Sequence, residues 1–146
     1  MLDTNVWLDL ALFEDPAFDA LRRSIETGEL RILATPRMRD ELADVLERPS
    51  VLVQASAARH RRGAGGVCVE AALAFFDRHS RIVPPAPASG LVCRDTDDQI
   101  FVDLAVAHRV RWLFSKDRAV LALARTAQRR HGLTIMTAAR AAGAPL

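Results

Sequence analysis

Several features that would place this chain in a particular class of protein are scarce or missing. It holds only two cysteines, Cys68 and Cys93, which are far apart and have no histidine beside them in a metal-ligand spacing. We therefore expect reduced thiols, buried or partly buried, rather than metal ligands. Charged residues interrupt every apolar run before it reaches the ~20 residues of a membrane span. The N-terminus lacks the basic region of a signal peptide, so we expect a cytoplasmic protein with no membrane contact.

The charge of the chain is nearly balanced but unevenly distributed. Lys and Arg number 20 and Asp and Glu 18, which leaves a net charge of +2. The arginines nevertheless gather in three clusters, which are residues 59–62, Arg109 with Arg111, and Arg129 with Arg130. Such clusters are most often solvated helix ends, and contact with nucleic acid is the second interpretation.

Short β-type runs alternate with longer helical patterns. The predicted strands are residues 31–35, 81–83, 110–115 and 133–136. The predicted helices are residues 36–47, 68–79 and 98–108. The strand runs are short and apolar or β-branched, whereas the helical runs repeat apolar residues at a spacing of three or four. This alternation predicts βαβ units and therefore an α/β fold with a mainly parallel sheet covered on both faces.

The segments between these elements predict loops and a single domain over residues 1–146. Residues 63–66 are glycine-rich and form a loop between two helices; without a following Lys-Ser or Lys-Thr they are no phosphate loop. Residues 84–90, rich in proline, form a second loop. The first strand is nearly absent, because only two residues precede Asp3, unless it continues through Val6 or the start codon is misplaced.

Acidic residues follow the predicted strands. Because active sites of parallel α/β folds lie outside the carboxyl ends of the strands, we expect these side chains at one edge of the sheet. The residues concerned are Asp3, Glu41, Asp97 and Asp98, and Asp117. Taken singly, the later aspartates are ordinary helix caps or turn residues and Glu41 a solvated helical residue. Asp3 is harder to dismiss, since a carboxylate at the end of a central buried strand must find compensation.

Four carboxylates at one edge imply a cation. Each like-charged pair at ~4 Å costs about 4 kcal/mol at an effective dielectric near 20, so protons or a divalent metal must offset the repulsion. Ligands that are all oxygen favour Mg²⁺ or Mn²⁺ over zinc. Such ions stabilise a phosphoryl group during transfer, which predicts phosphodiester hydrolysis.

Four segments, in order, resemble the motifs of PIN-domain proteins. They are residues 2–6, residues 40–49, residues 94–98 continuing to Ala105, and residues 113–117. The nearest likeness is to the toxins of bacterial toxin–antitoxin pairs, relatives of the VapC-type toxins. The resemblance implies a three-layer α/β/α sandwich and an Mg²⁺- or Mn²⁺-dependent ribonuclease that cleaves single-stranded RNA.

The resemblance also assigns roles to residues. Its four metal-holding catalytic acids correspond to Asp3, Glu41, Asp98 and Asp117. Asp98 is chosen over Asp95 and Asp97 because it stands seven residues before Ala105. Asn5 and Ser115 match positions that orient the acids. The chain departs from the pattern in its short first strand and at Ser115-Lys116, where relatives more often have Thr-Gly.

The leading hypothesis is an endoribonuclease toxin, with a cognate antitoxin covering its acidic site and arginine clusters guiding the RNA backbone. The family is commonly dimeric, so a homodimer is a further expectation. One alternative is a housekeeping nuclease that processes RNA or DNA. Another is a protein-interaction module with a degenerate site, which the presence of all four acids disfavours. A phospho-acceptor receiver domain is a poor match, because the expected lysine is missing after the last predicted strand.

Overall fold

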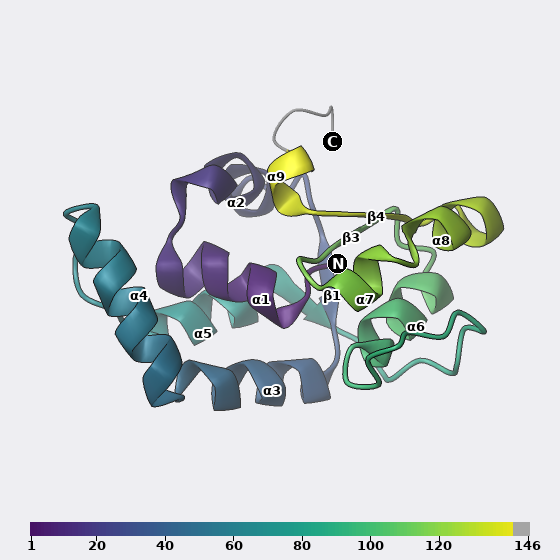
Figure 1. Cartoon of the computed structure of the whole chain (residues 1–146), viewed down its shortest axis with the longest axis horizontal. Coiled ribbons are helices and arrows are strands. Elements are labelled where there is room, and N and C mark those ends of the chain that lie inside the picture. Colours follow the sequence, from purple (N-terminus) through teal and green to yellow (C-terminus); the bar gives the residue numbers. More distant parts are fainter. Residues whose placement is uncertain (142–146) are drawn as a thin grey trace.

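Helices make up most of the fold, and short strands pair in parallel among them (Figure 1). The computed structural model describes residues 1–141, with side chains through Ala139. The strands are β1 (Ile32–Ala34), β2 (Ser80–Ile82), β3 (Trp112–Phe114) and β4 (Thr134–Met136). The first helices are α1 (Thr4–Trp7), the π-helix η1 (Leu8–Phe13), the 3₁₀-helix η2 (Pro16–Phe18) and α2 (Asp19–Glu26). The later ones are α3 (Pro36–Leu46), α4 (Pro49–Arg61), α5 (Val69–His79), α6 (Gln99–Ala107), α7 (Arg118–Leu121), α8 (Ala124–His131) and α9 (Ala138–Ala141).

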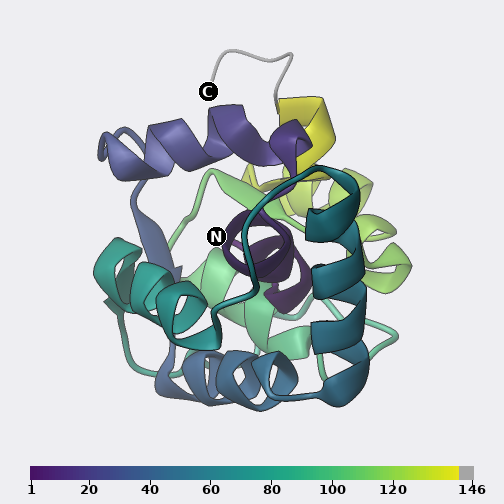
Figure 2. The same ribbon diagram turned by 90° about the vertical axis from the view of Figure 1, so that its left-hand side faces the viewer.

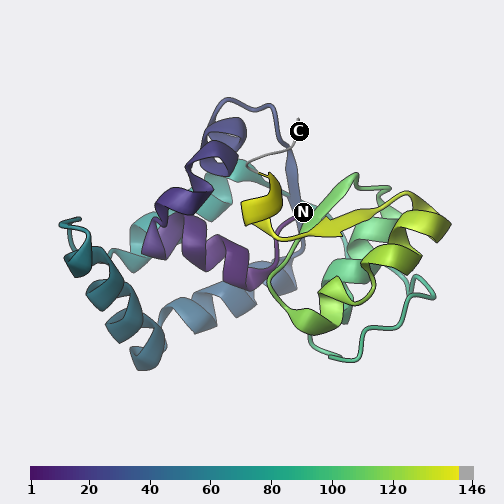
Figure 3. The same cartoon turned by 45° about the horizontal axis from the view of Figure 1, so that its top comes forward.

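The strands form two parallel pairs. In one pair β1 lies beside β2, with Leu33 opposite Arg81. In the other β3 lies beside β4, with α6, α7 and α8 grouped around them in Figure 3. The N-terminal residues extend the second pair, because the Asp3 amide donates to the Phe114 carbonyl at 3.0 Å in a parallel bridge. The predicted α/β class with parallel strands is confirmed.

The chain turns from strand to helix directly after Asp3, so continuation of the first strand through Val6 is wrong. The Asp3 carboxylate caps α1 by accepting a hydrogen bond from the Val6 amide at 2.8 Å. Figure 2 shows α1 and η1 nearly end-on at the centre, with α2, α3, α4 and α5 around them. This central position buries apolar side chains on every side of the segment, including Val6, Trp7 and Leu10.

The predicted middle elements are confirmed with small shifts at their ends. Helix α3 starts where expected, since the Thr35 hydroxyl accepts from the Met38 amide at 3.3 Å and a proline occupies the first turn. The glycine-rich segment 63–66 links α4 to α5, and the proline-rich segment 84–90 is a loop. Both cysteines are free thiols; Cys93 is buried, but Cys68 is exposed, contrary to expectation, because it precedes α5 at the surface.

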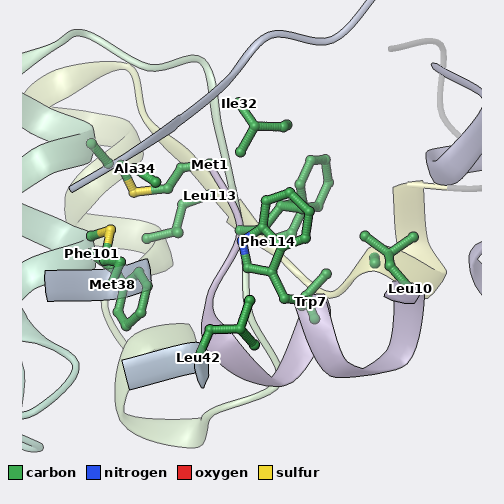
Figure 4. Packing of buried hydrophobic residues seen from close by; sticks show 14 of the residues in the cluster. Met1, Trp7, Leu10, Ile32, Ala34, Met38, Leu42, Phe101, Leu113 and Phe114 are labelled. Carbon is green, nitrogen blue, oxygen red and sulfur yellow. The ribbon is translucent and has the colours of Figure 1, made fainter. Parts of the chain in front are cut away.

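One hydrophobic core joins the N-terminal helix to the strands. Figure 4 shows Trp7, Leu42 and Phe114 packed together in it. The rings of Trp7 and Phe76 lie 4.8 Å apart between centroids, which ties α1 to α5. None of the helices among residues 1–141 has the length and apolar character needed to cross a membrane.

Two arginines of the first predicted cluster have structural partners. Arg59, in the last turn of α4, forms an ion pair with Glu14 at 2.7 Å and donates to the Leu12 carbonyl. Arg62 donates to the Phe13 carbonyl. Both arginines therefore donate to backbone carbonyls at the C-terminal end of the π-helix. Guanidinium donors used in this way are not available to RNA.

Candidate active site

Asp3 is the most deeply buried of the predicted acids, at 2% exposure. One carboxylate oxygen accepts from the Val6 amide at 2.8 Å and the other from the Lys116 amide at 3.3 Å. Burial raises the pKa of Asp3, while hydrogen bonds with Ser115, Val6 and Lys116 oppose that rise. The backbone of two distant segments thus holds this carboxylate in one orientation.

Glu41 is partly buried and faces the start of α1 from α3. Its carboxylate accepts a hydrogen bond from the Thr4 hydroxyl at 2.9 Å. Because Thr4 follows Asp3 directly, this bond brings the second predicted acid beside the first. Asn5, on the same short helix, lines the adjoining hollow and is exposed. Its side chain makes no hydrogen bond with an acid in the part of the chain that the structure describes.

Asp117 follows β3 and caps the short helix α7. Its Oδ1 accepts from the Ala119 amide at 2.6 Å and more weakly from the Val120 amide at 3.4 Å. The Asp117 amide donates to the hydroxyl of Ser115 at 2.9 Å. Ser115 is fully buried and also forms a hydrogen bond with Asp3, so its side chain couples these two acids. The cap that the sequence suggests for Asp117 is real and uses only its Oδ1.

The structure separates the three candidates for the third acid. Asp98 is half-buried at the start of α6, and its side chain makes no capping hydrogen bond there. Asp95 and Asp97 are exposed, and the Asp97 amide donates to the Asp95 carboxylate at 3.0 Å within a tight turn. The capping role considered for Asp98 is therefore absent, which leaves its carboxylate available for other interactions.

Electrostatics show which acids the fold brings together. The pKa of Asp98 is raised to about 6, first by burial and then by repulsion from neighbouring carboxylates. Those neighbours are Asp117, Asp95, Asp3 and Glu41. Asp98 thus lies within electrostatic range of the other three predicted acids, although the four come from separate segments. The largest contributions to the pKa of Asp98 all raise it, and none of them comes from an arginine or a lysine.

A hollow of about 840 Å³ lies between the N-terminal helix and α3. Asp3, Glu41 and Asp98 line it, whereas Asp117 faces a neighbouring hollow of about 590 Å³. Figure 1 shows the starts of α1 and α7 side by side at this place. Among the described residues no three His, Cys, Asp or Glu side chains form a ready metal-binding group. The donors are nevertheless all carboxylate oxygens, and the repulsion that they exert on Asp98 fits a hard divalent cation.

Asp9 is a residue of this site that the sequence pattern did not single out. It lies on the π-helix, only 8% exposed, and lines the larger hollow with the predicted acids. Its carboxylate is 2.5 Å from the ammonium of Lys116. Burial raises the pKa of Asp9, and the Lys116 ammonium opposes that rise. The only signal in the sequence was the departure at Lys116, whose charge needs a partner.

A pH-dependent stability difference follows from Asp98. In metal-free buffer, Asp98→Asn is expected to be more stable than the wild type by about 1 kcal/mol near pH 7, after allowance for partial exposure. The reason is that the pKa of Asp98 is about 6 in the folded protein, above the ordinary value of 3.8 for an aspartate side chain. The folded state therefore retains a proton that the unfolded state releases, and wild-type stability falls as the pH rises from about 4 to 6.

Urea unfolding at about pH 4 and pH 7 measures this difference. The neighbouring exposed variant Asp97→Asn is the matched control and should track the wild type at both pH values. An Asp98→Asn protein that is less stable than the wild type at both would show that this carboxylate stabilises the fold rather than straining it.

The four predicted acids lie in a region that matches a known protein family. A family model described as PIN domain matches residues 1–119, most of the chain and all four predicted acids. No curated protein and no solved structure gives a match. Residues 120–146, which contain α8 and β4, lie outside the matched range.

Proposed function

Since this chain belongs to the PIN-domain family, we propose that it is an Mg²⁺- or Mn²⁺-dependent endoribonuclease that cleaves single-stranded RNA. The family supports a nuclease in general terms; the metal and the RNA substrate are our proposal. The observation that carries it is the electrostatic coupling of Asp98 to Asp3, Glu41 and Asp117. Four such carboxylates at one edge of a fold suit phosphodiester hydrolysis.

We assign the metal to the same acids, Asp3, Glu41, Asp98 and Asp117. When bound there, a divalent cation would activate a water molecule and neutralise charge on the phosphoryl group. The chain itself supplies orientation. The amides of Val6 and Lys116 hold Asp3, and the Thr4 hydroxyl holds Glu41. Preorganised side chains of this kind reduce the reorganisation that the reaction requires.

Lys116 has a defined place in this proposal. Its amide helps to hold Asp3, but its ammonium pairs with Asp9 rather than with a predicted catalytic acid. The ammonium thus has its short contact with Asp9, although its charge still helps to lower the pKa of Asp3. An ammonium free to pair with them would compete with a divalent cation for the same oxygens.

The direct test is substrate choice. Purified protein is incubated with Mg²⁺ or Mn²⁺ and end-labelled single-stranded RNA, double-stranded RNA or single-stranded DNA. We expect internal cleavage of the single-stranded RNA. Cleavage of DNA at the same rate would favour the processing nuclease, and no cleavage of any substrate would favour the degenerate interaction module.

The choice of Asp98 as the third acid gives a second prediction. Asp98→Asn should lower the cleavage rate at least about a hundredfold, on the scale of removing one preorganised electrostatic interaction. Asp97→Asn should change the rate by less than about threefold, because Asp97 is exposed and engaged in a local turn. Single-turnover rates of the two variants decide between them, and the reverse ranking would move the third acid to Asp97.

We further propose that the protein is a toxin of the VapC type, inhibited by a cognate antitoxin. Induced expression in a bacterial host should arrest growth within a few generations, since cleavage of cellular RNA stops protein synthesis. Expression of Asp3→Asn at the same level is the control and should allow normal growth. Normal growth with soluble, RNA-cleaving wild type would instead favour a processing nuclease.

A further inference from the structure

We propose that the smaller hollow, between Arg94 and Arg118, binds a phosphate of the RNA backbone next to the acidic site. This inference rests on the proposed ribonuclease function and assigns a place for the substrate. The hollow has a volume of about 590 Å³, and Asp117 contributes to its wall. It therefore adjoins the predicted catalytic acids directly.

The larger hollow is a poor place for a phosphate. Its carboxylates outnumber its cations, seven to three. The carboxylates are Asp3, Asp9, Asp40, Glu41, Asp44, Asp97 and Asp98, and the cations are Arg37, Arg48 and Lys116. One of these cations, Lys116, is already paired with Asp9. An RNA backbone laid along this hollow would meet repulsion along most of its length.

In the smaller hollow, positive and negative side chains are equal in number. Arg94 and Arg118 stand there against Asp95 and Asp117. Both aspartates accept hydrogen bonds from backbone amides rather than from the arginines, Asp95 at 3.0 Å and Asp117 at 2.6 Å. Within the chain as far as Ala139, neither arginine forms an ion pair. Two exposed guanidinium groups thus keep their donors for an external ligand.

Guanidinium groups suit a phosphodiester because their paired N–H donors match two phosphate oxygens. The spatial order supports the assignment as well. Residues 95–98 separate the two hollows, with Asp95 facing the smaller and Asp98 the larger. A strand whose phosphate rests on the arginines would therefore lie against Asp117 and extend toward Asp98. The arginine clusters of the sequence contribute neither of these residues.

The test compares two double variants with the same loss of charge. Arg94→Ala/Arg118→Ala removes the proposed site, and Arg23→Ala/Arg78→Ala removes two exposed arginines, on α2 and α5, that line neither hollow. The first is expected to raise the KM for single-stranded RNA about tenfold and to change kcat less than about twofold. The slope of the logarithm of the RNA-binding constant against the logarithm of salt concentration should become shallower by about 0.7 for each phosphate that is no longer neutralised. Fluorescence anisotropy in the Asp3→Asn background measures this slope. The control should leave both quantities unchanged.

A third variant guards against a folding defect. Arg94→Lys/Arg118→Lys keeps the charge but loses the paired donors, and its KM should fall between those of the wild type and the alanine variant. Equal KM values and equal salt slopes for the alanine variant and its control would overturn this inference while the ribonuclease function stands. A wild type that neither binds nor cleaves RNA would instead overturn the function itself.

Discussion

Removal of divalent cations with EDTA is expected to lower RNA cleavage by this protein about a thousandfold or more. The largest influences on the pKa of Asp98 are burial and four neighbouring carboxylates, and all of them raise it. Neither cysteine offers a replacement for a metal there, since Cys93 is buried and Cys68 lies at the surface before α5. A metal contributes several kcal/mol to such a reaction, and each 1.36 kcal/mol is about tenfold in rate.

Cleavage of an end-labelled single-stranded RNA measures this effect. Excess Mg²⁺ or Mn²⁺ added after EDTA should restore the rate, which separates loss of metal from loss of protein. Added metal should also raise the melting temperature of the wild type, because a ligand that binds only the native state stabilises it. Undiminished cleavage in EDTA would exclude the metal-dependent mechanism.

Asp3→Asn is expected to lower the cleavage rate at least about a hundredfold. The amide has the same shape and one oxygen that still accepts from the Val6 amide, so the cap of α1 survives. It carries no negative charge, however, and cannot serve as an anionic ligand. Folding should be little changed, because two effects oppose each other: the neutral amide avoids the cost of burying a charge, but its nitrogen cannot accept from the Lys116 amide as the second carboxylate oxygen does.

The measurement is the single-turnover rate together with thermal melting. Asp19→Asn, an exposed acid on α2, is the matched control and should leave both unchanged. A folded Asp3→Asn protein with a rate within about tenfold of the wild type would remove Asp3 from the proposed chemistry and leave it as a helix cap.

Helices α3, α5 and α6 were predictable because their signals are local. A threonine cap followed by proline begins α3, and apolar residues repeat at helical spacing through each of the three. The strands were predictable for a similar reason, since short β-branched runs stood between these helices. The parallel arrangement then follows, because strands joined through helices run in the same direction.

The helix over Thr4–Phe13 could not be predicted from the local sequence. Its apolar residues are so dense that neither strand nor helix spacing stands out in the sequence. This segment is helical because Asp3 caps its start and because its apolar side chains are buried on all sides among α2, α3, α4 and α5. Asp9 was missed for the same reason, because a single acid within an apolar run carries no sign of its partner.

The sequence by itself determined the α/β class, the elements of the middle of the chain and the acids predicted to act together, because each depends on neighbouring residues or on the direction of parallel strands. Only the tertiary structure decided how these acids are arranged. It half-buried Asp98 within range of the other carboxylates, placed Asp117 toward a second hollow and paired Lys116 with Asp9. These features depend on contacts between segments far apart in the chain, and no local pattern of residue types encodes them.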